Sequence, residues 1–159
     1  MNIEILKILE KNARLSSEQI ATMIGSDRET VRAEIAEMEA AGIILSYNAI
    51  IDWDKTERET VSARIDVKLT PQHDRGFDRV AEQIYNHPEV KAVYLMSGSY
   101  DLSVLIEGRT MKEVAFFVSQ KLAPIDAVMS TATHFVLHKY KDIGVLYHPV
   151  ETDERENCL

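Results

Sequence analysis

Four consecutive residues between two apolar runs, Gly98-Ser99-Tyr100-Asp101, carry the most distinctive chemistry in this chain. Glycine supplies backbone conformations that other residues avoid, and an aspartate accepts hydrogen bonds from nearby amides, so the residue types alone favour a hairpin turn. The alternative is a ligand site in which the Asp101 carboxylate meets a polar partner. On residue types alone, the hairpin turn is the favoured interpretation.

The other reactive side chains form no catalytic or metal-binding pattern. His134 and His138 are four residues apart, but four residues of a strand span roughly 13 Å, too far to share one ion. Ser97 and Ser99 lack the Gly-x-Ser-x-Gly frame of a hydrolase, and the six glycines form no phosphate or dinucleotide fingerprint. We therefore expect no catalytic residue, no metal and no cofactor, and hence a protein that is not an enzyme.

Composition sets further bounds on function. The 159 residues are 45% hydrophobic, which suits one large globular domain or two small ones. The net charge of −8 opposes general polyanion binding, so any contact with nucleic acid must be local. With no apolar run of about 18 residues, no signal peptide and a single cysteine, Cys158, we expect a cytoplasmic protein without membrane contact.

The first third of the chain is predicted to be helical. Ser16 and Gln19 form a capping box that opens a second helix, and Ser26 or Asp27 can cap a third after a tight turn. This order of helix, helix, turn and helix indicates a helix-turn-helix, with its motif at about residues 17–36.

The segment 43–52 is too apolar and β-branched for a linker, and it predicts one or two strands that leave the third helix. Such a ribbon makes the expected domain at residues 1–52 a winged helix-turn-helix. The charged residues 53–59 that follow are the expected seam between domains.

The second part alternates between strand and helix patterns. In residues 61–69 apolar and polar side chains alternate strictly, which predicts a strand with one buried face. The remaining elements are expected to be a helix, a hairpin, a helix and a final strand, at residues 77–87, 90–107, 111–122 and 127–140. The order β-α-β-β-α-β is that of a ferredoxin-like domain, placed at residues 58–148, and makes the fold class α+β. Residues 149–159 are expected to form an acidic, flexible tail.

Both faces of the strand that opens the hairpin are apolar, with Val93 and Leu95 on one side and Ala92, Tyr94 and Met96 on the other. The two helices of a ferredoxin-like domain cover only one face of its sheet. We therefore expect the other face to be buried, most simply by a second copy of the same sheet.

The domain order resembles the Lrp/AsnC, or feast/famine, family of prokaryotic transcriptional regulators over nearly the whole chain. The residues that carry the resemblance are Asn12-Ala13-Arg14-Leu15-Ser16, Thr30-Val31, Ile35, Gly42-Ile43-Ile44, Tyr47, Ala49, Asp52 and Gly98-Ser99-Tyr100-Asp101. In the last motif Ser99 replaces the acid that is usual in the family. The resemblance implies binding of double-stranded DNA and of a small amino acid, by a homodimer that assembles to a tetramer or octamer.

The same resemblance suggests the site residues. The candidates for contact with DNA are Ser17, Arg28, Thr30, Arg32 and Ala33, of which Arg32 is expected to reach a base or phosphate. The candidates for the effector, which the family encloses between subunits, are Gly98, Ser99, Tyr100, Asp101, Thr131 and Thr133. Asp101 would take the ammonium group of the amino acid. Ordinary strand packing is the competing explanation for Thr131 and Thr133.

One feature of the helical part argues against strong DNA binding. Residues 1–52 hold five basic and nine acidic side chains, a net charge of −4, whereas contact with phosphates favours a positive one. Several weak heads can still bind together through avidity. The alternative hypothesis is an amino-acid-sensing oligomeric partner protein that has lost or weakened its own DNA binding. An enzyme of ferredoxin-like fold is a third hypothesis, and the absence of an acid-base or nucleophile cluster speaks against it.

Overall fold

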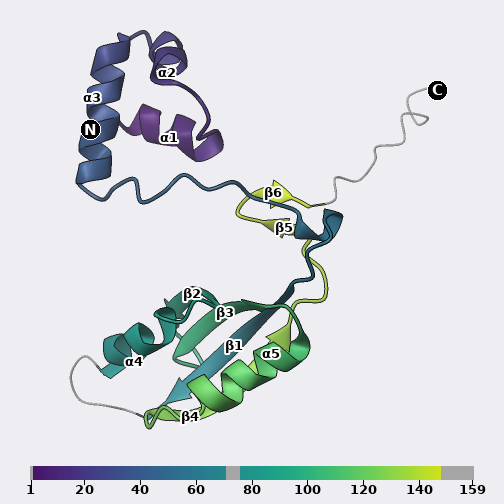
Figure 1. Cartoon of the computed structure of the whole chain (residues 1–159). Helices are drawn as coiled ribbons and strands as arrows, with labels where there is room; N and C mark the ends of the chain where they lie inside the picture. The colour runs from purple at the N-terminus through teal and green to yellow at the C-terminus, as the bar shows by residue number, and fades with distance from the viewer. Residues whose placement is uncertain (1, 71–75, 148–159) are drawn as a thin grey trace, which may run out of the picture. The chain divides into compact units, whose positions relative to one another are not determined.

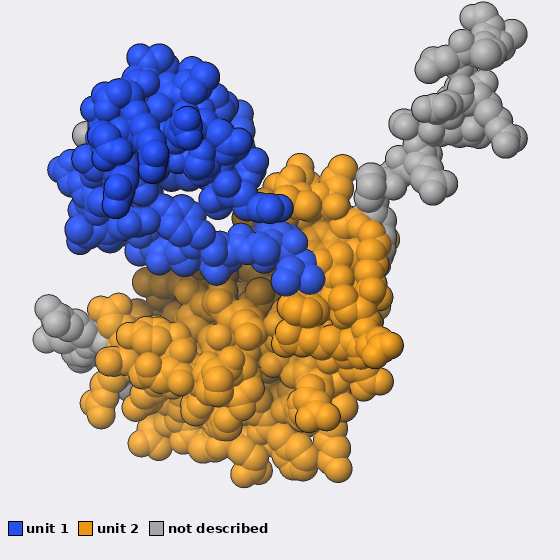
Figure 2. Space-filling view, turned by 45° about the horizontal axis from the view of Figure 1, so that its top comes forward, with its two compact units in different colours: residues 1–51 blue, residues 52–159 orange. Residues whose placement is uncertain are grey.

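The computed structural model describes residues 2–70 and 76–147, and the chain divides into two compact units (Figure 2). The division falls between Ile51 and Asp52, at the start of the charged segment. Each unit has its own cluster of buried apolar side chains. No helix in the described ranges is long and apolar enough to cross a membrane.

The first unit contains three helices, α1 (Ile3–Lys11), α2 (Ser17–Ile24) and α3 (Arg28–Ala40) (Figure 1). The capping box before α2 is confirmed, because the Gln19 N–H donates to Ser16 Oγ at 3.2 Å and the Ser16 N–H donates to Gln19 Oε1 at 2.9 Å. The N-cap of α3 is Asp27, whose Oδ1 accepts the Thr30 N–H at 2.9 Å. These local bonds satisfy amides that would otherwise lack a partner at each helix start.

The prediction of strands in residues 43–52 is wrong for this chain. No residue of this segment is in a strand, and the N–H groups of Ile43 and Ile44 both donate to the Met38 carbonyl, at 2.9 and 3.2 Å. Leu45 is 86% exposed. β-Branched residues favour strands because they pack against neighbouring strands, and this segment has none beside it within the described chain.

The second unit is built around a four-stranded antiparallel sheet in the order β2-β3-β1-β4 (Figure 1). Its strands are β1 (Val61–Leu69), β2 (Val90–Leu95), β3 (Leu102–Gly108) and β4 (Val128–Phe135), and its helices are α4 (Gly76–Tyr85) and α5 (Met111–Phe117). The sequence β1-α4-β2-β3-α5-β4 confirms the expected βαββαβ order and the α+β class.

The two faces of this sheet differ in character. Ile65 of β1 lies between Val104 of β3 and Thr133 of β4, and the apolar side chains of this face pack with buried residues of α4 and α5. The opposite face carries the polar residues of β1, including Arg64 and Asp66. The apolar character expected from β2 therefore does not extend across the face, because the central strand β1 is polar on that side. Burial of this face by a second copy stays a prediction.

Several element boundaries also differ from expectation. β4 ends at Phe135 rather than near Tyr140, and the second predicted helix of this unit continues after α5 as a π-helical turn, Val118–Leu122. A short 3₁₀ turn, Trp53–Lys55, and a two-stranded hairpin, β5 (Lys141–Asp142) and β6 (Val145–Leu146), were not predicted. The hairpin turns through Ile143 and Gly144, and an isoleucine with φ 45° is not a turn signal that sequence reasoning expects.

Two features predicted or noted from the sequence lie outside the described residues. The proposed tail at residues 149–159 is one, and the solitary Cys158 is the other.

Candidate effector site and DNA-binding face

The candidate effector residues 98–101 lie in the loop of the β2–β3 hairpin. Residues 96–101 join β2 to β3, and the loop is closed by the Met96 N–H, which donates to the Asp101 carbonyl at 2.8 Å. The Asp101 N–H in turn donates to the Val67 carbonyl at 2.9 Å. The loop is thus held against the last third of β1.

The Asp101 carboxylate is already in contact with two groups of β1. Its Oδ2 accepts the Leu69 N–H at 2.8 Å, and its Oδ1 lies 3.3 Å from Lys68 Nζ. The hydrogen bond from the Leu69 amide, together with the Lys68 ammonium, lowers the pKa of Asp101 below its usual value. The group is therefore a carboxylate at neutral pH.

In this geometry the Asp101 carboxylate has a structural role, and it can still accept further hydrogen bonds. Each carboxylate oxygen can accept more than one hydrogen bond, and 20% of the side chain is exposed. A ligand ammonium would share the carboxylate with Lys68 or displace it. Sequence reasoning missed Lys68, although the βαββαβ order places the start of β3 beside the end of β1 and could have suggested it.

The structure brings the other effector candidates together only in part. Gly98 and Ser99 are exposed in the loop and Tyr100 is half-buried. Thr131 lies on the other side of β1 from the hairpin, in register with Val67, so two strand spacings of about 5 Å separate it from β3. Thr133 lies two residues farther along β4, opposite Ile65. Both threonines are half-buried on the helix-covered face, as ordinary packing would have them.

The polar face of the sheet has a hydrogen-bonded cluster that the sequence did not reveal. Arg64 Nε donates to the Ser103 hydroxyl at 2.8 Å, and Asp66 Oδ2 lies 3.5 Å from His134 Nε2. Among the described residues no group of three or more His, Cys, Asp and Glu is arranged to hold a metal ion. The polar contact of His134, on β4, is with Asp66 of the neighbouring strand β1.

Three of the five DNA candidates lie together on the first unit. One concave surface, which encloses a volume of about 520 Å³ between the start of α2 and the first two turns of α3, is lined by Ser17, Arg28 and Arg32. The surface includes the N-terminus of α2, where the helix dipole favours an anion such as a phosphate. Tyr47 also lines this surface and was not predicted; its hydroxyl donates to Glu39 Oε1 at 2.8 Å.

The other two DNA candidates do not line this surface. The Thr30 hydroxyl donates to Asp27 Oδ2 at 2.6 Å, a bond that helps to cap α3 and lowers the pKa of Asp27. Ala33 is exposed farther along α3. Arg28 is also weakly paired with Glu29, at 4.0 Å.

Both units match known families. Residues 2–44 match the winged helix-turn-helix DNA-binding family, and residues 62–146 match the Lrp/AsnC ligand binding domain. The chain belongs to the Lrp/AsnC family. It is a transcriptional regulator with a helix-turn-helix and a ligand-binding domain, as the resemblance implied.

Curated relatives agree over most of the chain. The uncharacterised HTH-type transcriptional regulator YugG of Bacillus subtilis (strain 168) is 50% identical over 153 residues, which cover 96% of this chain and 92% of YugG. The HTH-type transcriptional regulator LrpA of Pyrococcus horikoshii is 29% identical over 137 residues, 86% of this chain and 94% of LrpA.

Solved structures show the same fold. The transcriptional regulator NMB0573 of Neisseria meningitidis, in complex with L-Met, matches with a TM-score of 0.73 and 23% identity, over 88% of this chain and 90% of that one. The feast or famine regulatory protein Rv3291c of M. tuberculosis, complexed with L-methionine, matches with a TM-score of 0.73 and 16% identity, over 88% and 92%.

Proposed function

We propose that this protein is a one-component regulator that binds double-stranded DNA through α2 and α3 and responds to a small amino acid. Arg28 and Arg32 make the contacts with DNA, with Ser17 at the backbone. The observation that supports this most directly is the gathering of these three side chains on one concave surface of the helix-turn-helix unit. The domains that carry the two activities are residues 1–52 and 58–148.

The effector site in this proposal is the loop 98–101 together with Thr131 and Thr133, enclosed between subunits of a homodimer that assembles to a tetramer or octamer. Two solved relatives hold L-methionine, which supports an amino acid as the ligand class. Asp101 supplies an anion for the ammonium group, and its lowered pKa keeps it charged at physiological pH. Because its target is bacterial or archaeal DNA, we place the protein in the cytoplasm.

The effector works by differential affinity. An amino acid that binds one assembly better than another shifts the population between them by no more than that difference, typically about 1–3 kcal/mol. We therefore expect graded regulation rather than an absolute switch.

The test is fluorescence anisotropy of labelled DNA from upstream of the protein's own gene, at several salt concentrations, with a panel of amino acids. Arg32→Ala should weaken binding by about 1–3 kcal/mol at a base contact, or reduce the salt slope by about one at a phosphate contact. Lys7→Ala, at an exposed position of α1, is the matched control because Lys7 does not line the concave surface. Equal losses in both variants would show that Arg32 has no specific role.

A second function is favoured by the acidic first unit, with its net charge of −4 over residues 1–52. In this alternative the protein senses an amino acid and co-assembles with a related regulator, without binding DNA itself. Oligomers that respond to an amino acid but show no specific DNA binding even at low salt would support the alternative.

A further inference from the structure

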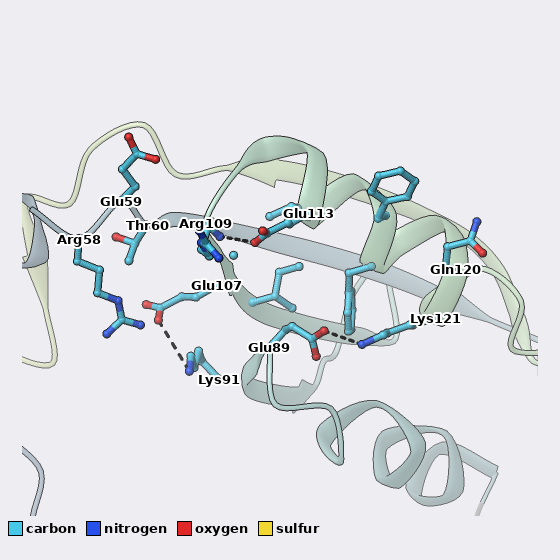
Figure 3. Close-up of a pocket in the computed structure, with 15 residues that line it drawn as sticks. Arg58, Glu59, Thr60, Glu89, Lys91, Glu107, Arg109, Glu113, Gln120 and Lys121 are labelled. Atoms are coloured by element: carbon cyan, nitrogen blue, oxygen red, sulfur yellow. Dashed lines mark hydrogen bonds and ion pairs between the residues drawn. The ribbon is translucent and has the colours of Figure 1, made fainter.

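A cavity of about 460 Å³ lies in the second unit (Figure 3). It is bordered by residues 58–60 before β1, by the end of β3 and by one side of α5 and the turn after it. Its volume is within the range of about 300–1,000 Å³ that is typical of small-molecule sites. The Asp101 carboxylate meets β1 at Leu69, whereas this cavity meets the chain at Thr60, nine residues away, or roughly 30 Å along a strand.

The interior of the cavity is apolar and partly aromatic. Ile106, Val114 and Phe117 are each at most 4% exposed, so they form a rigid floor that belongs to the core of the unit. Phe116 is 53% exposed and also lines the cavity. An apolar ligand body placed between these side chains would be removed from water on several sides.

The polar rim has one unfilled hydrogen-bonding position. Glu89 Oε1 accepts a hydrogen bond from Lys121 Nζ at 2.6 Å, as the dashed line in Figure 3 marks. The second oxygen, Glu89 Oε2, is buried and has no hydrogen-bond partner. The bond from Lys121 lowers the pKa of Glu89, so the carboxyl group is charged and can only accept hydrogen bonds.

Several other charged groups of the rim have contacts within the chain. Glu107 lies 3.9 Å from Lys91 Nζ, and Glu113 Oε2 accepts the Arg109 N–H at 2.7 Å. The Arg58 guanidinium lies 4.3 Å above the Trp53 ring. The lining holds four basic and four acidic residues, so the rim has no excess charge that would draw in a strong anion.

We propose that this cavity is a second ligand site, which takes a small amphipathic cation: a primary amine with an aromatic or branched apolar body. The Glu89 side chain is 35% exposed, and a turn of its carboxylate brings Oε2 to the cavity, where the ammonium group donates to it. The body packs on Phe116, Phe117 and Val114. A buried acceptor without a donor is costly, and an ammonium group removes that cost, whereas a wholly apolar ligand leaves it in place. A carboxylate would be repelled by the same oxygen.

This site is independent of the proposed effector site and of DNA binding. Its border includes Arg58–Thr60, which join the ligand-binding domain to the segment that follows the helix-turn-helix. An occupant therefore touches the residues that lead into β1, all of them within the second unit.

The experiment is calorimetric titration of the full-length protein with 2-phenylethylamine. Two probes of similar shape serve as ligand controls, 3-phenylpropanoate for the charge and 2-phenylethanol for the apolar body. We expect the amine to bind at least ten times more tightly than the anion, with the alcohol between them. A wild-type protein that binds no amine, or binds amine and anion equally, overturns the proposal.

Two variants separate a ligand role of Glu89 from a structural one. Glu89→Gln should weaken amine binding about tenfold or more, because the charge is lost while the shape remains. Lys121→Met should strengthen it, because Glu89 loses its internal cation and both of its oxygens become available. If both variants lose affinity alike, Glu89 acts only through the structure and the proposal fails.

The aromatic wall is tested by a matched pair of exposed aromatic residues. Phe116→Ala should weaken binding of both the amine and the alcohol several-fold. Tyr85→Ala, on α4 and 55% exposed, should leave both unchanged because Tyr85 does not line the cavity. Asp101→Asn should likewise leave amine binding intact. Loss of binding in this last variant would show that the amine occupies the proposed effector site instead.

Discussion

Each of the two units of this regulator is stabilised by its own internal contacts, and these contacts differ greatly in sequence separation between the units. In the helix-turn-helix unit the bonds that start α2 and α3 join residues three apart, Ser16 with Gln19 and Asp27 with Thr30. In the ligand-binding unit Asp101 is joined to Lys68 and Leu69, which are 33 and 32 residues away. A substitution at a cap of the first unit should therefore destabilise one helix end. A substitution in the second unit should destabilise the sheet as a whole.

The candidate sites follow the same division. The DNA-binding surface depends on a turn and two adjacent helices, so its side chains are neighbours in sequence. The loop 96–101 is positioned by a strand from another part of the chain. The comparison therefore predicts that variants in the second unit couple stability to ligand binding more strongly than variants in the first.

The largest expected effect is in the centre of the sheet. Ile65→Ala removes a side chain that is 0% exposed, and truncation of a buried isoleucine costs about 2–5 kcal/mol of the free energy of unfolding. Denaturant unfolding followed by Trp53, the single tryptophan, reports on this unit. Met129→Ala, at a position 61% exposed, is the control and should change little. Similar effects from both would contradict the assignment of the core.

Asp101→Asn should have the next largest effect, about 1–2 kcal/mol at pH 7, because a hydrogen bond to a charged group is replaced by a neutral one. The folded pKa of Asp101 lies below its unfolded value of about 3.9, so the stabilisation is present above that pH and is lost as the pH falls through the folded value. Unfolding curves of wild type and variant should therefore converge in acid. A difference that is constant down to pH 2 would show that the carboxylate charge is not its source.

Ser16→Ala should cost about 1 kcal/mol by removing the N-cap of α2. Ser26→Ala is a matched control, because the structure assigns the cap of α3 to Asp27 rather than to its neighbour. Amide hydrogen exchange should show faster exchange at the start of α2 and unchanged protection in the sheet. Loss of protection in both units would refute the view that the first unit depends on local contacts.

Glu29→Gln should have the smallest effect on stability, below about 0.5 kcal/mol, because its contact with Arg28 is 4.0 Å long and both side chains are largely exposed. Its effect on DNA should be clearer, since it removes a negative charge beside Arg28. We expect tighter DNA binding in the anisotropy assay, most visibly at low salt. Unchanged binding would place Arg28 away from the DNA.

Sequence reasoning succeeded where the determining contacts are local or periodic. The capping box at Ser16 and the alternation in β1 were both predicted from spacing and are confirmed. It failed where a segment depends on what lies beside it. Residues 43–52 have strand-forming side chains but no neighbouring strand among the described residues, and the face of the sheet judged from β2 alone proved polar at its centre.

The same limit applies to the candidate sites. Asp101 could be selected from its motif, but nothing in the motif shows that Leu69 and Lys68 already engage its carboxylate. Glu89 could not be selected from the sequence, because a single glutamate before a strand belongs to no recognisable binding motif. Its unpartnered oxygen and the aromatic side chains near it meet only when β3 and α5 are in place.

By itself, the sequence determined the order of the main helices and of the four strands of the sheet, the capping box of α2 and the membership of the Lrp/AsnC family. These depend on residue type and on spacing within a few residues. Only the tertiary structure decided which charges are paired, which face of the sheet is polar and where a cavity opens. Those properties come from side chains that are tens of residues apart in the chain, and sheet pairing brings them within hydrogen-bonding distance.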